Sequence, residues 1–355
     1  MDDAPFTDTK RLGQHLERRY AIRPTTIDLL DAGGVFRVDR ADGPSWVARV
    51  FARARPLERA EGEAGVLRFL EEQAYPAERC AHDDPVSELD GRAVLVTGHV
   101  NGTPPGHGGR SNIFPWVFEV LGELLATLHM MGGLSGALKR DAGSWHGDPR
   151  HEGLPRQDIA AAGAWLDDVE QRVPAAGREP FDLLREHLAD TDDCGDLPRC
   201  LVHPDFVPVN AIESSGMRLT IVDWTGSGLG PRVASLANLL WSVVGKHEGT
   251  EDERVDAVVA GYRRHVDLED DELSRLADAM WIRPLLFACW YYRSSVGSGY
   301  VPTGREPWWP DRKPVNRVTR SARAAFKAES LPRPDRRADP DAPKPEIPGQ
   351  LSLAD

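Results

Sequence analysis

Cysteine is scarce in this sequence, and its arrangement argues against a zinc site or a redox-active pair. The 355 residues contain four cysteines, and no two of them form a CxxC motif. The spacing of Cys194 and Cys200 matches no familiar zinc-binding pattern. Because cytosolic proteins rarely keep disulfides, we expect all four thiols to be reduced and the protein to be cytoplasmic.

Long apolar runs and an excess of positive charge are lacking too. No uninterrupted apolar stretch approaches the roughly 20 residues that a membrane span needs, and the N-terminal MDDAPFTDTK is too acidic and polar for a signal peptide. Lys and Arg number 43 against 56 Asp and Glu, so the net charge is −13. We therefore expect no nucleic-acid or membrane partner, whereas a cationic substrate is compatible with the charge.

The first hundred residues have the pattern of β-strands around one helix. The predicted strands, separated by turn-forming residues or by one helix, are 25–30, 34–40, 45–51 and 92–98. The helix lies between the last two strands, at residues 58–73. It has Ala64, Leu67 and Leu70 at helical spacing and acidic residues at its start, where the helix dipole favours them.

The rest of the chain is mainly helical by pattern. Pro284 should kink or break the last helix, and the acidic run from Glu269 to Glu272 should be a helix start in water. The strong strand signal in this half lies between residues 201 and 224. The predicted helices are 113–131, 157–173, 232–244, 251–266 and 271–295.

This order of elements indicates two lobes with a cleft between them. We expect the lobes to span residues 1–100 and 101–330, since a chain of this length with 41% hydrophobic residues can bury a sizeable core. From residue 331 onward, six prolines in 25 residues and few large apolar side chains predict a disordered tail.

The stretch LVHPDFVPVNAIESSGMRLTIVDW, residues 201–224, should bring three oxygen-bearing side chains together. Its centre, residues 214–216, consists of turn formers between two apolar segments, which predicts a β-hairpin. With a turn centred on residues 216 and 217, Asn210 would face Asp223. Asp205 would lie in the loop just before the hairpin.

These three groups suit one kind of chemistry. Carboxylate and amide oxygens are ligands that Mg²⁺ accepts while it shares substrate phosphates. A further carboxylate within hydrogen-bond reach can orient a hydroxyl and accept its proton. The pattern therefore indicates phosphoryl transfer, where positioning and charge neutralisation provide most of the catalysis.

At this point the sequence resembles a known family. HPDFVPVN followed by IVDW resembles the catalytic and metal-binding segments of the aminoglycoside phosphotransferase and choline kinase group, which has a protein-kinase-like fold. The similarity covers about residues 25–300 in the family's order. Further matching segments are EAGVLRFL (63–70, the small-lobe helix with a Glu), LVTGHVNG (95–102, the hinge) and LLATLHMMG (124–132, a helix ending in Leu-His).

The resemblance implies a fold and roles in the helical half. The fold would be α+β and two-lobed, with a small antiparallel-sheet N-lobe containing one helix and a larger, mainly helical C-lobe. Asp205 would be the catalytic base, and His203 would support the catalytic loop. Asn210 and Asp223 would hold Mg²⁺ on the phosphates of ATP.

The resemblance also implies a nucleotide site in the first lobe. Arg49 and Glu63 would form an ion pair at the phosphates, and Gly33 and Gly34 would lie in a turn that covers the phosphates. Backbone groups of Thr97, Gly98, His99 and Val100 would hold the adenine.

Several positions depart from the family pattern. Pro204 replaces the usual Gly after the His, Arg49 offers a planar fork where a Lys offers a point charge, and the turn at residues 32–36 is short. Ser235 stands where the family often has a supporting Asp. A second HGD, at residues 146–148, lacks the matching Asn, so we interpret His146 and His151 as part of a solvated loop.

Two functions remain open on this basis. The first is an ATP-dependent kinase that phosphorylates a small-molecule hydroxyl, for which a cationic antibiotic such as an aminoglycoside is one candidate. The second is a kinase-like binding module for a protein or peptide partner, or a modifier of peptide Ser or Thr in a natural-product pathway. The short glycine turn, Ser235 and the Pro-rich tail favour the second, whereas the presence of all three of Asp205, Asn210 and Asp223 favours the first.

Overall fold

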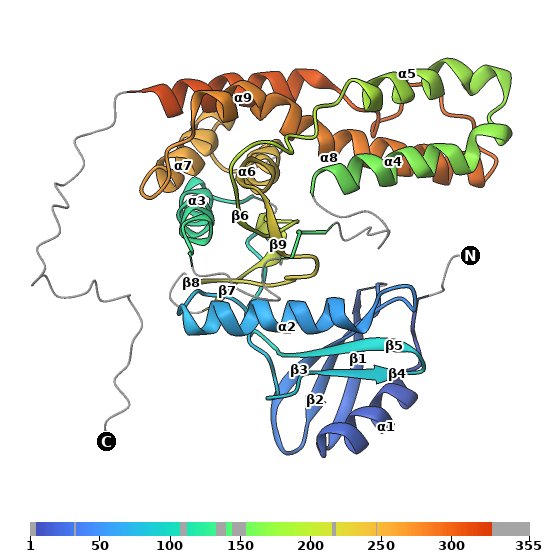
Figure 1. Cartoon of the computed structure of the whole chain (residues 1–355), viewed down its shortest axis with the longest axis vertical. Coiled ribbons are helices and arrows are strands. Elements are labelled where there is room, and N and C mark those ends of the chain that lie inside the picture. Colours follow the sequence, from blue (N-terminus) through green and yellow to red (C-terminus); the bar gives the residue numbers. More distant parts are fainter. Residues whose placement is uncertain are drawn as a thin grey trace, which may run out of the picture.

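The protein consists of two lobes stacked on each other (Figure 1). The computed structural model describes residues 5–31, 33–106, 112–132, 140–143, 154–214, 218–245 and 247–328. The predicted tail from residue 331, and the loop with His146 and His151, lie outside these ranges. The architecture confirms the predicted α+β class, with an antiparallel sheet first and helices afterwards.

The N-terminal lobe is built on a five-stranded antiparallel sheet with the strand order β1-β2-β3-β5-β4. Four of these strands match predicted segments, while the additional strand β4 is too short to show an alternating pattern in the sequence. The strands are β1 (Pro24–Asp31), β2 (Val35–Arg40), β3 (Gly43–Val50), β4 (Val86–Leu89) and β5 (Arg92–Gly98).

Two helices accompany this sheet, so the prediction of a single helix is wrong. The predicted helix is α2 (Leu57–Glu72), which lies between the sheet and the other lobe (Figure 1). The unpredicted helix is α1 (Thr9–Tyr20), whose buried residues Leu12, Leu16 and Tyr20 repeat once per turn between charged neighbours. This narrow stripe packs on the far face of the sheet, against Phe36 among others.

The C-terminal lobe is mainly helical and contains all five predicted helices as well as α5 and α9, which are absent from the prediction. Its helices are α3 (Pro115–His129), α4 (Arg156–Val169), α5 (Arg178–Ala189), α6 (Arg232–Trp241), α7 (Glu251–Tyr262), α8 (Asp270–Gly297) and α9 (Arg312–Lys327). Two antiparallel strand pairs lie on the side that faces the N-terminal lobe: β6 (Arg199–Val202) with β9 (Gly228–Pro231), and β7 (Ala211–Ser214) with β8 (Arg218–Ile221).

Pro284 does not break α8, contrary to one of the two expected outcomes. The helix runs from Asp270 to Gly297 with Pro284 inside it. A proline removes one backbone hydrogen bond and disfavours the turn before it. Trp281 and Leu285 are buried on either side of it, and we attribute the continuity of the helix to this packing.

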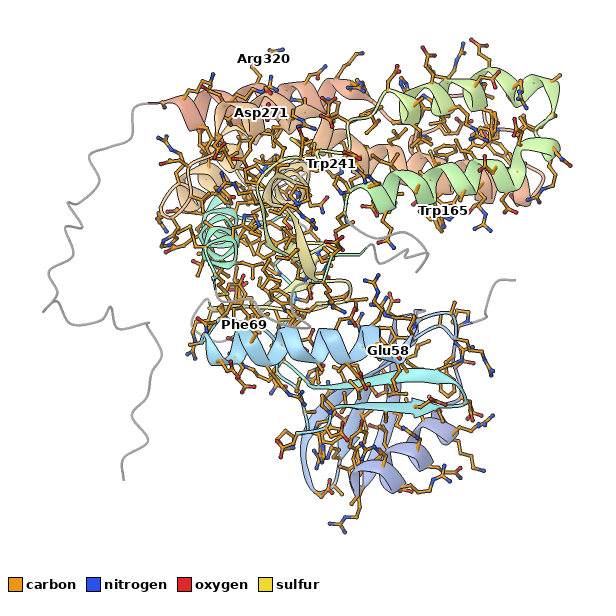
Figure 2. All side chains as sticks on the ribbon, in the orientation of Figure 1. Glu58, Phe69, Trp165, Trp241, Asp271 and Arg320 are labelled. Atoms are coloured by element: carbon orange, nitrogen blue, oxygen red, sulfur yellow. The ribbon has the colours of Figure 1, made fainter. Side chains whose placement is uncertain are left out.

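Backbone pairing and a shared core join the two lobes. The Ile221 N–H donates to Pro76 O (2.8 Å) and the Glu78 N–H donates to Ile221 O (3.0 Å), so residues 76–78 pair with β8. Just beyond the expected lobe boundary, Thr103 pairs with Glu213 of β7 in an antiparallel bridge. Phe69, labelled in Figure 2 near the end of α2, belongs to the same hydrophobic cluster as the helices of the C-terminal lobe.

Two further observations concern membrane-spanning helices and the cysteine thiols. Among the described helices, none is long and apolar enough to cross a membrane. All four cysteines are free thiols, of which Cys194 and Cys289 are buried.

His129 makes the stability of this core depend on pH. It ends α3, is buried, and places Nδ1 2.7 Å from the Tyr262 hydroxyl. Burial, with a smaller effect of Arg232, lowers the pKa of His129 to about 3. The unfolded chain takes up this proton below a pKa of about 6.5, so the folded state loses stability as the pH falls from there toward 3.

Replacing His129 with glutamine should therefore flatten the pH dependence of stability. Between pH 6 and pH 4, the free energy of unfolding of the wild type should fall more steeply, by up to about 1.4 kcal/mol per pH unit. Urea unfolding at several pH values measures both slopes. Parallel slopes would show that His129 does not titrate on unfolding.

Candidate active site

The loop after β6 is fixed by His203, which is fully buried. The Asp205 N–H donates to Nδ1 of His203 (3.1 Å), so Nε2 carries the ring proton and donates it to Val222 O (3.1 Å). Burial lowers the pKa of His203, which keeps the ring neutral, although Asp223 and Asp205 oppose this shift. His203 thus ties the loop to the residue before Asp223.

Both oxygens of the Asp205 carboxylate accept hydrogen bonds. The amide Nδ2 of Asn210 donates to Asp205 Oδ2 and to its backbone carbonyl, at 2.9 Å each. On the other side, Arg283 Nη1 of α8 donates to Asp205 Oδ1. The side chain remains 24% exposed, so the carboxylate is oriented and still accessible.

Helix α6 supports this loop from behind. Ser235 Oγ donates to His203 O (2.8 Å), and Asn238 Nδ2 donates to Pro204 O (2.7 Å). Two neutral donors, three residues apart on one helix face, thus bind the loop carbonyls where the family often has an Asp. Asn238 was not among the residues predicted from the sequence. Its spacing of three residues from Ser235 indicates that both side chains lie on the same face of the helix.

The β7–β8 hairpin has a register one residue different from the predicted one. Ala211 faces Ile221, and the Val222 N–H donates to Asn210 O (2.9 Å), so Asn210 is paired with Val222 and not with Asp223. The outer edge of β8 is paired with residues 76–78, which lie far away in the sequence. The prediction considered only the hairpin itself and could not include this constraint.

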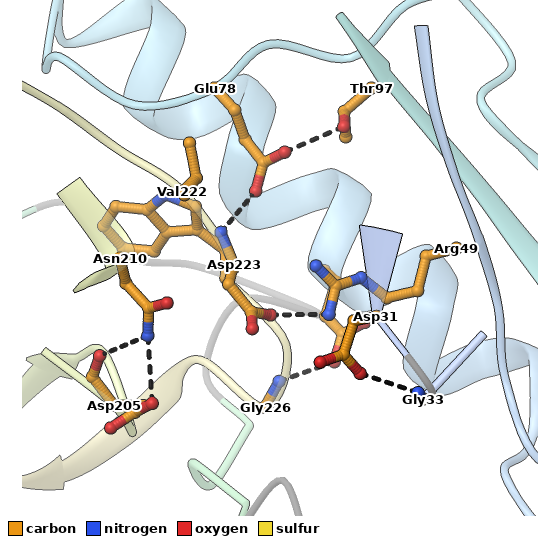
Figure 3. Close-up of polar contacts among 12 residues, drawn as sticks. Asp31, Gly33, Arg49, Glu78, Thr97, Asp205, Asn210, Val222, Asp223 and Gly226 are labelled. Atoms are coloured by element: carbon orange, nitrogen blue, oxygen red, sulfur yellow. Dashed lines mark hydrogen bonds and ion pairs between the residues drawn. The ribbon is translucent and has the colours of Figure 1, made fainter. Parts of the chain in front are cut away.

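Asp223 nevertheless lies beside Asn210, because the chain bends just after β8. Asp223 has a positive φ of 65°, a conformation that Asp tolerates better than most residues. Its N–H donates to Glu78 Oε1 (2.7 Å), and Glu78 Oε2 accepts from Thr97 Oγ1 (2.8 Å) (Figure 3). Glu78 lies in an irregular segment after α2, so no sequence pattern identified it.

Glu78 and Arg49 surround Asp223 with opposite charges. Arg49 Nη1 donates to Asp223 Oδ1 (2.6 Å). Burial raises the pKa of Asp223, but the opposing effects, of which that of Arg49 is the largest, leave it below its ordinary value. Burial raises the pKa of Glu78, only partly opposed by Arg49.

The predicted ion pair between Arg49 and Glu63 does not form. Arg49 pairs with Asp223, whereas Glu63 contacts Arg55 and, at 3.8 Å, Arg140. Glu63 Oε1 also accepts from the Gly226 N–H (2.7 Å). Arg55 lies just before α2, about two turns from Glu63, and this local neighbour takes the predicted place of Arg49.

The glycine turn between β1 and β2 packs tightly on β3. Gly34 has φ of +87°, and a Cβ there would lie 2.6 Å from Val50 O. The Gly33 N–H donates to Asp31 Oδ1 (2.6 Å). The turn lies on the Arg49 side of the site in Figure 3.

The predicted adenine-binding segment, residues 97–100, begins with the last two residues of β5 and continues beyond the strand. The Gly98 N–H donates to Arg79 O (2.8 Å) and the His99 N–H donates to Ser45 O (2.9 Å), so two of the four amides are already engaged. Thr97 is held through its hydroxyl by Glu78. Thr97 lies opposite Val47 in the pairing of β5 with β3, and the Val100 N–H makes no hydrogen bond to a residue that the structure describes.

The donor set fits a divalent cation shared with phosphates better than a metal held by the protein alone. Within the described ranges, no group of three or more His, Cys, Asp or Glu side chains could hold a metal. Asn210 uses its NH₂ group on Asp205, which leaves its carbonyl oxygen on the side of Asp223 (Figure 3). One amide and one carboxylate oxygen are the small set that Mg²⁺ requires when phosphates and water complete its shell.

Comparison with known proteins agrees with this geometry. The model of the phosphotransferase enzyme family matches residues 31–277. A search of curated proteins finds no match to this chain. Among solved structures, the complex of an amicoumacin kinase with AMP-PNP, Ca²⁺ and Ami has a TM-score of 0.58 at 16% identity, with 90% of this chain and 93% of that chain covered.

Two other kinases show the same likeness. A microcompartment-associated aminopropanol kinase has a TM-score of 0.54 at 18% identity, with 90% of this chain and 95% of that chain covered. A choline kinase from Streptococcus pneumoniae has a TM-score of 0.52 at 16% identity, with 88% and 98% covered. These structures confirm the kinase-like fold, and the family model spans most of the sequence: the chain belongs to the phosphotransferase enzyme family.

Proposed function

We propose that this protein transfers the γ-phosphoryl group of ATP to a hydroxyl of a small molecule. The observation that carries the proposal is the convergence of Asp205, Asn210, Asp223 and Arg49 between the two lobes (Figure 3). A binding module without catalysis would have no need of an oriented carboxylate beside this set. Similarity to kinases of amicoumacin, aminopropanol and choline supports a small-molecule acceptor.

In this proposal Asp205 is the catalytic residue at the acceptor. Its carboxylate would accept a hydrogen bond from the acceptor hydroxyl, turn the oxygen toward the phosphorus and take the proton as the new P–O bond forms. The hydrogen bonds from Asn210 and Arg283 fix the direction of the carboxylate before the acceptor binds. Such preorganisation avoids part of the entropic cost of reaching the reactive geometry.

The phosphates would be bound by residues of both lobes. Arg49 would place guanidinium donors against phosphate oxygens, a geometry that the planar fork favours. Asn210 and Asp223 would hold Mg²⁺, which when bound neutralises charge on the phosphates. Glu78 would keep Asp223 in place through its backbone N–H.

Calorimetric titration of ATP, with and without Mg²⁺, tests the proposal. The wild type should bind ATP more than about tenfold more tightly when Mg²⁺ is present, a difference of about 1.4 kcal/mol. Asp223→Ala should abolish this difference because it removes the carboxylate ligand. Asp168→Ala, at an exposed carboxylate of α4 that pairs with Arg293, is the control and should behave as the wild type. Failure of the wild type to bind nucleotide under either condition would refute the proposal.

A further inference from the structure

A hollow lies beside Asp205 on the side of the helical lobe. Together with solvent at its mouth, it encloses about 560 Å³. Its walls include Ser235 and Asn238 of α6, Arg283 and Phe287 of α8, and Asp158 of α4. Pro204, the residue before Asp205, also lines this hollow, and Arg283 of its wall contacts the Asp205 carboxylate.

Arg283 connects this hollow to the proposed catalytic base. Its Nη1 donates to Asp205 Oδ1, and its side chain is 19% exposed. Of its donors, Nε and Nη2 make no hydrogen bond to any residue that the structure describes. A guanidinium has five N–H donors in one plane, so Arg283 can hold Asp205 and a second anion at the same time.

The neighbours of Arg283 along α8 are apolar. Ile282, Leu286 and Phe287 lie next to it along α8, and the guanidinium carbon lies 5.4 Å from the centre of the Phe287 ring. The other charged residue of the wall is Asp158, across the hollow on α4, with its Oδ1 buried. Arg283 is therefore the cation of this wall, and it lies directly against the carboxylate proposed to contact the acceptor hydroxyl.

We infer that the acceptor carries an anionic group, in the simplest case a carboxylate, next to the hydroxyl that is phosphorylated, and that Arg283 binds this group. This inference rests on the proposed function, since it takes the hollow as the acceptor site. The hydroxyl would contact Asp205 while the neighbouring carboxylate accepts from Nε and Nη2, the paired geometry that arginine favours. An ammonium group at the same place would lie against the guanidinium, so the cationic acceptor that the net charge allows is disfavoured here.

Three small probes with one phenyl ring and one hydroxyl test the charge preference. Mandelate carries a carboxylate beside its hydroxyl, mandelamide is its neutral isostere, and 2-amino-1-phenylethanol carries an ammonium group. Their dissociation constants are measured by ligand-observed NMR on the full chain without nucleotide. We expect mandelate to bind roughly tenfold more tightly than the other two, the scale of a hydrogen-bonded charge pair.

Variants of α8 then assign the preference to one residue. Arg283→Gln should abolish it, Arg283→Lys should keep part of it, and Arg293→Gln, at an arginine on the same helix paired with Asp168, should leave it unchanged. Thermal unfolding confirms that each variant is folded. Equal or tighter binding of the ammonium probe, no binding of mandelate, or a preference that survives Arg283→Gln would overturn the inference.

These binding measurements and the ATP titration can fail independently of each other, so they test the acceptor class and the kinase activity separately. Mandelate preference without Mg²⁺-dependent ATP binding would support an anion-binding hollow and sink the kinase proposal. Mg²⁺-dependent ATP binding without mandelate preference would leave the kinase proposal intact and refute the acceptor class.

Discussion

Replacing Asp205 with asparagine should reduce phosphoryl transfer by at least about a hundredfold, the lower range for loss of a general base. An amide has nearly the size of the carboxylate and can still accept a hydrogen bond, but it cannot take the proton of the acceptor hydroxyl. Asp205 makes no contact with Arg49 or Asp223 through its carboxylate, whose partners are Asn210 and Arg283. ATP affinity should therefore stay within about threefold of the wild type, well under the 1.4 kcal/mol of a tenfold change.

The measurement is ADP release from ATP and Mg²⁺ with a panel of small hydroxyl acceptors, alongside calorimetry of ATP binding. Asp168→Asn repeats the same chemical change at an exposed position and should retain full activity. If Asp205→Asn keeps more than a tenth of the wild-type rate, another group accepts the proton and the assignment of Asp205 is wrong. Unchanged ATP binding in an inactive variant separates a catalytic defect from misfolding.

Replacing Arg232 with methionine should destabilise the protein by about 3–5 kcal/mol, because it leaves a buried carboxylate without its cationic partner. Glu272 at the start of α8 is fully buried and accepts two hydrogen bonds from the Arg232 guanidinium, one of them from Nε at 2.6 Å. Arg232 is the first residue of α6, and this pair joins α6 to α8. Chemical denaturation with urea gives the free energy of unfolding of both proteins.

A more exposed pair of the same kind provides the control. Arg317 of α9 donates two hydrogen bonds to Glu251, but its side chain is 53% exposed. Arg317→Met should cost less than about 1 kcal/mol, as exposed pairs do. A second check is the double variant Arg232→Met with Glu272→Met, which should recover part of the loss. Equal effects of the two single substitutions would show that burial does not decide the strength of the pair.

Local sequence could predict the groups that we propose to be reactive, because they lie within one short stretch. Asp205, Asn210 and Asp223 are adjacent in the structure for reasons encoded between residues 201 and 224, namely a loop, a hairpin and a bend. Even there the register was wrong by one residue. The pairing that fixes it comes from residues 76–78, and no pattern within the hairpin contains that information.

The residues that hold these groups could not be predicted in the same way. Glu78 and Arg283 reach the site from the irregular segment after α2 and from the middle of α8, and in the sequence each is an ordinary charged residue. The acidic run at Glu269–Glu272 shows the converse error. Its pattern suits a solvated helix start, yet Glu272 is fully buried because Arg232, far away in the sequence, lies against it.

The backbone pairing between the lobes has a practical consequence for dividing the chain. Val66, Leu70 and Tyr75 belong to the same apolar cluster as Leu121 and Leu125 of α3. A fragment ending near residue 100 would expose these side chains to water and leave residues 76–78 without the strand they pair with. We expect such a fragment to aggregate when expressed alone. We expect two co-expressed fragments to assemble into folded protein in higher yield when the break lies in the segment between α8 and α9 than when it lies at the hinge.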